Sequence, residues 1–130
     1  MSQRVVIIGM GIYSCIGKNK EEVLKSLFEG KSGIGVIPSR KEMGYRSMLC
    51  GILEKPNLKG VLDRRQRLNL SEHGEYAYLA TVEALKQAGI DQKFLLQNEV
   101  GILYGNDSSA LAIIEGADII REKKNTILVG

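Results

Sequence analysis

Residues 4–17 constrain the fold of this chain more than any other stretch. The sequence RVVIIGMGIYSCIG opens with a run of β-branched residues, Val5 to Ile8, and continues into a turn that carries Gly9, Gly11 and Gly17. A short, unbroken apolar run that is closed by glycines is typical of a strand buried on both faces, as at the centre of a parallel sheet. We therefore expect the other elements to pack as layers over this strand.

Composition places the chain among ordinary globular proteins. Its 130 residues are 44% hydrophobic and 25% charged, which fits one folded domain rather than a disordered chain. Glycine interrupts the longest apolar run well short of the roughly 20 residues that span a bilayer. Tyr13 is also too bulky for a signal-peptide cleavage site after that run. We expect a cytoplasmic protein that does not bind membranes.

Cysteine, histidine and basic residues indicate neither a metal site nor a nucleic-acid site. Cys15 and Cys50 lack the spacing of zinc ligands, and His73 is the single histidine. The net charge of +3 is too small to indicate nucleic acid on its own, and the tyrosines do not alternate with lysine and arginine. We interpret Cys15 as a packing residue and His73 as a surface or capping residue.

Local capping signals predict a first helix directly after the glycine turn. Asn19 stands three residues before Glu22, and apolar residues then repeat at helical spacing until Gly30. Residues 31–62 change in character, because they are rich in glycine and contain both prolines of the chain. We interpret this part as an irregular surface excursion, in the form of a hairpin.

The second half of the chain alternates helix, strand and helix. A long helix is predicted over about 70–88, with alanines along one face and Gly89 at its end. A second buried strand over 99–105 precedes a helix over about 110–122. This alternation predicts an α/β fold with a mostly parallel sheet and flanking helices. So few strands leave the sheet incomplete, with unpaired edges, so we expect the N-terminal piece of a larger protein.

The glycine turn also permits a dinucleotide-binding hypothesis. Gly9-x-Gly11 follows an apolar run as the Rossmann fingerprint requires. However, Ser14 stands where that motif has its third glycine, and the helix begins late, at Lys20. The next predicted strand does not end in an acidic residue about 20 positions on, where one would hold a ribose. A Rossmann-like nucleotide-binding module is therefore the weaker alternative.

The stretch VVIIGMGIYSCIGKNKEEVLKSLFEGKSGIG resembles the opening of the β-ketoacyl-acyl carrier protein synthases. Members of that family typically begin with a strand, then G-x-G-x-x-S-x-x-G, a capped helix and an E-G-x-S-G-I segment. The matching residues here are Gly9, Gly11, Ser14, Gly17 and Glu29 to Ile34. The resemblance covers residues 1–130, and the later segments look most like the type I elongation synthase. Those segments are Leu62 to Arg65, Glu83 to Gly89, Val100 to Ile102 and Gly116 to Asp118.

The resemblance implies a thiolase-like layered fold, of which this chain is part of the N-terminal half, and a homodimer. It implies a decarboxylative Claisen condensation in fatty acid elongation, in which malonyl on acyl carrier protein loses carbon dioxide and attacks an acyl thioester on a cysteine. Acyl chains arrive on the phosphopantetheine of acyl carrier protein, and no other cofactor is expected. The protein is thus expected to be an acyltransferase.

The family's catalytic cysteine, histidines and lysine fall beyond Gly130, so the resemblance places no catalytic residue in this chain. We expect the chain to be inactive by itself. A catalytic synthase and a noncatalytic partner similar to a chain-length factor both fit the residues present. A free-standing helix-sheet interaction module would require that 130 residues fold stably alone.

The resemblance assigns functional content to a few positions of this chain. Ser108 corresponds to a residue that reaches across the dimer toward the acyl pocket and limits chain length. Because serine is small, we expect medium and long acyl chains to be admitted. Arg64, Arg65 and Lys124 correspond to positions where docking residues for the acidic carrier protein tend to be basic, and surface arginines steer such a partner by long-range attraction.

Overall fold

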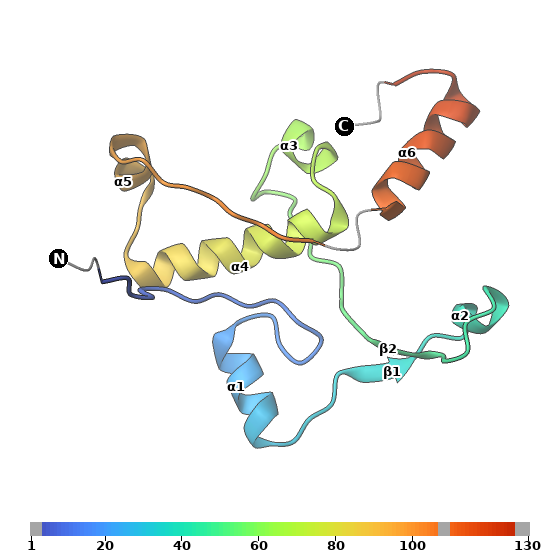
Figure 1. The fold of residues 1–130 in the computed structure, drawn as a ribbon, viewed down its shortest axis with the longest axis horizontal. Coiled ribbons are helices and arrows are strands. Elements are labelled where there is room, and N and C mark those ends of the chain that lie inside the picture. Colours follow the sequence, from blue (N-terminus) through green and yellow to red (C-terminus); the bar gives the residue numbers. More distant parts are fainter. Residues whose placement is uncertain (1–3, 107–109, 127–130) are drawn as a thin grey trace. The chain divides into compact units, whose positions relative to one another are not determined.

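The computed structural model describes residues 4–106 and 110–126 (Figure 1). The chain divides into a first unit, Met1–Lys55 with Tyr78–Asp91, and a second unit, Pro56–Ala77 with Gln92–Gly130. No helix among the described residues is both long and apolar enough to cross a membrane. In chain order the elements are α1 (Lys20–Phe28), β1 (Ile34–Val36), α2 (Ser39–Glu42), β2 (Leu49–Gly51), α3 (Arg64–Leu68), α4 (Glu72–Ala88), α5 (Gln92–Gln97) and α6 (Ala110–Lys123).

Helix α1 forms where the capping residues predict it. The side chain of Asn19 accepts a hydrogen bond from the backbone N–H of Glu22 at 2.9 Å, and Gly30 follows the helix with φ +63°. Buried Ser26 donates its hydroxyl to the carbonyl of Ile16 at 2.6 Å. This bond holds α1 against the glycine turn, and the buried Val23 lies on the same helix.

Helices α4 and α6 also lie where the sequence predicts them. Helix α4 spans Glu72–Ala88, and Gly89 ends it in the left-handed conformation, with φ +68°. Helix α6 spans Ala110–Lys123. Most of α4 is half-buried, and Glu75 is its one fully buried residue among those described.

The glycine-rich excursion contains an antiparallel hairpin of β1 and β2. Ile34 lies opposite Gly51 and Val36 opposite Leu49. The segment between the strands forms the single turn of α2, where the guanidinium of Arg40 lies 4.2 Å from the centre of the Tyr45 ring. This stacking is a cation–π contact. Helix α2, like α3 and α5, is an element that the sequence interpretation did not include.

The expected buried strands over 5–8 and 99–105 are not strands in this structure, and this corrects the sequence interpretation. Neither segment pairs with a neighbour, and Val5 and Leu103 are 94% and 102% exposed. Apolar β-branched runs favour extended backbone, but a strand also needs a neighbour for its hydrogen bonds. The described residues supply no such neighbour here, and their one sheet is the antiparallel pair β1–β2 rather than a parallel array.

Candidate functional site

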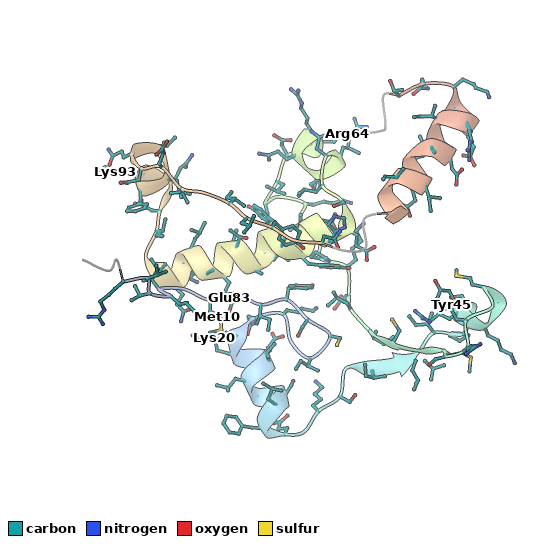
Figure 2. The ribbon with its side chains drawn as sticks, viewed as in Figure 1. Met10, Lys20, Tyr45, Arg64, Glu83 and Lys93 are labelled. Carbon is teal, nitrogen blue, oxygen red and sulfur yellow. The ribbon has the colours of Figure 1, made fainter. Side chains whose placement is uncertain are left out.

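The glycine turn packs against helix α4 within the first unit. A β-carbon on Gly9 would lie 2.2 Å from the carbonyl oxygen of Ala84, and one on Gly11 would lie 1.8 Å from that of Ala80. Both distances are far below van der Waals contact, so only glycine permits this approach. Figure 2 shows Met10 and Glu83 where the turn passes α4. The glycines of the turn thus pack against the alanine face of α4.

This packing removes the basis of the dinucleotide-binding hypothesis. In that motif the glycines allow a phosphate to approach the backbone, whereas here they allow a helix to do so. Beyond them, a two-residue turn closes the segment: Ser14 N–H donates to the carbonyl of Gly17 at 2.8 Å and Gly17 N–H to that of Ser14 at 3.2 Å. Residues 9–17 therefore serve packing between elements.

A cavity of about 410 Å³ lies beside this turn in the first unit, and charged side chains line much of it. Lys18 forms an ion pair with Glu54, and the hydroxyl of Tyr13 donates to the carbonyl of Glu54 at 3.0 Å. The hydrogen bond from Lys18 and its charge lower the pKa of Glu54, and the same pair raises the pKa of Lys18. Lys25 and Glu29 form a further ion pair at 3.8 Å. Lysine and glutamate side chains thus balance each other in charge along the cavity wall.

The two cysteines belong to the first unit, and His73 belongs to the second. The thiol of half-buried Cys15 lies 3.2 Å from the position of a β-carbon on Gly51, so it packs against the hairpin, which also carries Cys50. His73 belongs to the first turn of α4, where its Nε2 lies 2.8 Å from the hydroxyl of Ser71. Over residues 4–106 and 110–126, no group of three or more His, Cys, Asp or Glu side chains is arranged to hold a metal ion.

Arg64 and Arg65 occupy the first turn of helix α3, and both are exposed. Figure 2 shows the side chain of Arg64 extending outward from α3. A capping box holds this helix: Asp63 accepts from Gln66 N–H at 2.8 Å, and the Gln66 side chain accepts from Asp63 N–H at 2.9 Å. The cap is a local reason why α3 presents its arginines at a defined place.

Lys124 directly follows helix α6, is exposed, and has a positive φ of 53°. Nearby, Arg121 pairs with Asp118 at 3.1 Å. No contact between α3 and α6 is present in the described part of the chain, so the structure does not bring Arg64 and Arg65 together with Lys124. Ser108 lies outside the described residues.

Sequence reasoning missed two side chains of α4 that bind the glycine turn. Glu83 accepts from the backbone N–H groups of Ile12 and Lys20, and Gln87 accepts from that of Met10 at 2.7 Å. The available signal was their spacing of four residues, which places both on one side of the helix beside the alanines. Their partners lie more than sixty residues earlier in the chain, so the sequence alone does not reveal the pairing.

Comparison with known proteins gives consistent results along the chain. The family described as "Beta-ketoacyl synthase, N-terminal domain" matches residues 2–129. The 3-oxoacyl-[acyl-carrier-protein] synthase 1 of Haemophilus influenzae is 37% identical over 98% of this chain and 32% of its own length. Its counterpart from Escherichia coli K12 is 35% identical with the same coverage of both chains. The chain thus spans about a third of the length of these relatives.

The structure agrees with these sequence comparisons. A crystal structure of a β-ketoacyl synthase from Burkholderia phymatum superposes with a TM-score of 0.80 over 99% of this chain and 32% of that one. At 22% identity this match shows the fold alone. It confirms a partial α/β fold of the thiolase-like kind, although among the described residues the segments over 5–8 and 99–105 do not form strands. The chain belongs to the β-ketoacyl synthase family, whose N-terminal domain it matches from residue 2 to residue 129.

Proposed function

We propose that the protein is a β-ketoacyl-acyl carrier protein synthase of fatty acid elongation. In the reaction, malonyl on acyl carrier protein loses carbon dioxide, and the resulting carbanion attacks an acyl thioester on an enzyme cysteine. A carbon–carbon bond forms, the cysteine thiolate leaves, and the acyl chain grows by two carbons. The observation that carries the proposal is 37% identity, over 98% of this chain, to a relative named 3-oxoacyl-[acyl-carrier-protein] synthase 1.

This 130-residue chain is proposed to contribute no catalytic side chain. The family resemblance implies a nucleophile beyond Gly130, so neither Cys15 nor Cys50 is proposed for that role. Cys15 packs against the hairpin at Gly51. The nucleophile of such a reaction needs a lowered pKa and an electropositive setting. The role of this chain is therefore to support a site whose reacting groups lie elsewhere, in a cytoplasmic enzyme that needs no cofactor beyond the phosphopantetheine of its carrier protein.

Acyl carrier protein is the proposed partner of the basic residues Arg64, Arg65 and Lys124. All three are exposed, and they lie at the start of α3 and the end of α6. Exposed cations of this kind increase the rate at which an acidic partner is captured. The capping box of α3 supports the proposal, because it holds two of the three cations on one helical turn.

A homodimer is proposed because the family resemblance implies one, and Ser108 is proposed to face the acyl pocket across that dimer. Serine is small, so it leaves the floor of the pocket open to medium and long acyl chains. Replacing it with phenylalanine fills that space. The chain-length profile of the S108F variant should shift toward short acyl groups, whereas an unchanged profile contradicts the role.

An assay on the intact natural protein tests the proposed function. Purified protein is supplied with acyl and malonyl groups on acyl carrier protein, and both carbon dioxide and the β-ketoacyl product are measured. We expect turnover with the intact protein and none with residues 1–130 alone. An intact protein that makes no product, but changes the chain length produced by an active synthase, is a noncatalytic partner. Failure in both assays overturns the proposal.

A further inference from the structure

One carboxylate on helix α4 binds two backbone N–H groups, one within the glycine turn and one at the start of α1. Oε2 of Glu83 accepts from Ile12 N–H at 2.9 Å, and Oε1 accepts from Lys20 N–H at 2.7 Å. Glu83 itself is half-buried. Each oxygen therefore has its own donor, and the carboxylate joins three segments: the turn, the start of α1 and the middle of α4.

Both donors are suited to a negative charge. Lys20 is the first residue of α1, so its N–H has no partner within the helix and lies at the positive end of the helix dipole. The Ile12 N–H belongs to the turn and points at the same carboxylate. Two N–H groups from separate segments that converge on one anion form an oxyanion site, and hydrogen bonds from amides to a charged acceptor are stronger than neutral ones.

The glycines bring this site within reach of the helix. Because Gly9 and Gly11 have no β-carbon, the turn lies directly against the backbone of α4 at Ala84 and Ala80. At that separation a glutamate side chain from α4 spans the gap to both donors. The packing of the glycines and the position of the carboxylate are therefore parts of one arrangement.

We propose that the glycine turn and the start of α1 form an internal oxyanion site, and that Glu83 is the anion that occupies it. The site accepts a small carboxylate, which the chain supplies from its own helix. Removal of that side chain leaves a site that takes up formate from solution. The two donors are thus already occupied by a side chain of the protein, and an external anion cannot reach them.

Substitution by alanine and by glutamine separates this proposal from a role in packing alone. Glu83→Ala removes both acceptors. Glu83→Gln keeps the shape but has a single acceptor oxygen, and its NH₂ group faces a backbone donor. If Glu83 only fills space, glutamine should replace it without loss. If it is the anion of the site, the stability of the glutamine variant must fall below that of the natural protein.

Thermal unfolding of the intact protein in sodium formate provides the test, with sodium chloride at equal ionic strength as reference. We expect E83A to have a Tm several degrees below that of the natural protein, and formate to restore part of the difference in a saturable way. The natural protein and E115A, which removes an exposed glutamate from α6, should show no formate-specific change. An equal response of E83A and the natural protein overturns the proposal.

A second readout keeps the proposal testable if E83A does not fold. Hydrogen exchange at the Ile12 and Lys20 amides is compared between the natural protein and E83Q. We expect faster exchange in E83Q at one or both of these amides, together with a lower Tm. If E83Q matches the natural protein in both Tm and exchange, the charge is not required and the proposal fails.

Discussion

Gly11 is required by contact rather than by backbone conformation. Its φ is not among the positive values of the chain, which belong to Gly30, Gly44, Gly60 and Gly89 among the described glycines. A β-carbon at Gly11 would instead lie 1.8 Å from the carbonyl oxygen of Ala80 and 2.7 Å from its carbonyl carbon. These are backbone atoms of α4, so they cannot turn aside as a flexible side chain can.

The substitution Gly11→Ala should therefore destabilise the intact protein. Overpacking of this kind costs about 1–3 kcal/mol, and here the turn must separate from α4. Urea unfolding measures the loss. Glu115→Ala is the control, because Glu115 is exposed on α6 and alanine is compatible with a helix. Equal stability of the two variants would refute the steric argument.

At the scale of elements, α3 and the end of α6 carry the proposed docking surface for acyl carrier protein. Reversing Arg65 and Lys124 together to glutamate should weaken carrier-protein binding by about tenfold or more, since each exposed charge pair contributes up to about 1 kcal/mol. The unfolding midpoint should change little, because both side chains are exposed. Binding is measured by titration at low and physiological salt.

Lys93 on helix α5 provides the control for this charge reversal, since it is also an exposed cation (Figure 2). Lys93→Glu changes the net charge by the same amount as either single reversal, Arg65→Glu or Lys124→Glu. Lys93 lies outside the proposed surface. If K93E weakens binding as much, per charge, as R65E and K124E do, attraction is general to the protein. The assignment of the surface to α3 and α6 would then be wrong.

The elements that the sequence predicts correctly are those determined by neighbours along the chain. Asn19 and Gly30 bound α1, and Gly89 ends α4, through interactions within a few residues. Helices α2, α3 and α5 have only four to six residues, which is too short for a periodic pattern. The capping pair of Asp63 and Gln66 was nevertheless a local signal for α3.

The features that the sequence could not reveal depend on distant contacts. The runs over 5–8 and 99–105 have strand composition, yet a strand exists only when a neighbour accepts and donates its hydrogen bonds. The candidate site shows the same limit. Glycines in the turn and alanines in α4 are both visible in the sequence, but their contact joins segments about seventy residues apart, as the bond from Ile12 to Glu83 does.

At the scale of the whole molecule, the described residues bury little apolar surface. Val23 and Leu58 are their only fully buried hydrophobic side chains, whereas Phe28, Ile7 and Leu103 are 84%, 89% and 102% exposed. A folded domain of this length typically buries about two thirds of the surface of its unfolded chain. Burial of apolar side chains is the main favourable contribution to folding, so residues 1–130 alone have a weak driving force for a unique structure.

We therefore expect residues 1–130, produced alone, to bind a hydrophobic dye, to self-associate and to unfold over a broad temperature range. The intact protein should bind little dye and unfold sharply, because further apolar surface is then available to cover the segments over 5–8 and 99–105. Dye fluorescence, sedimentation and calorimetry on both proteins measure the difference. A monomeric 130-residue chain with sharp, two-state unfolding would contradict this expectation. It would show that α1, the hairpin and α4 suffice for a stable fold, as a free-standing interaction module requires.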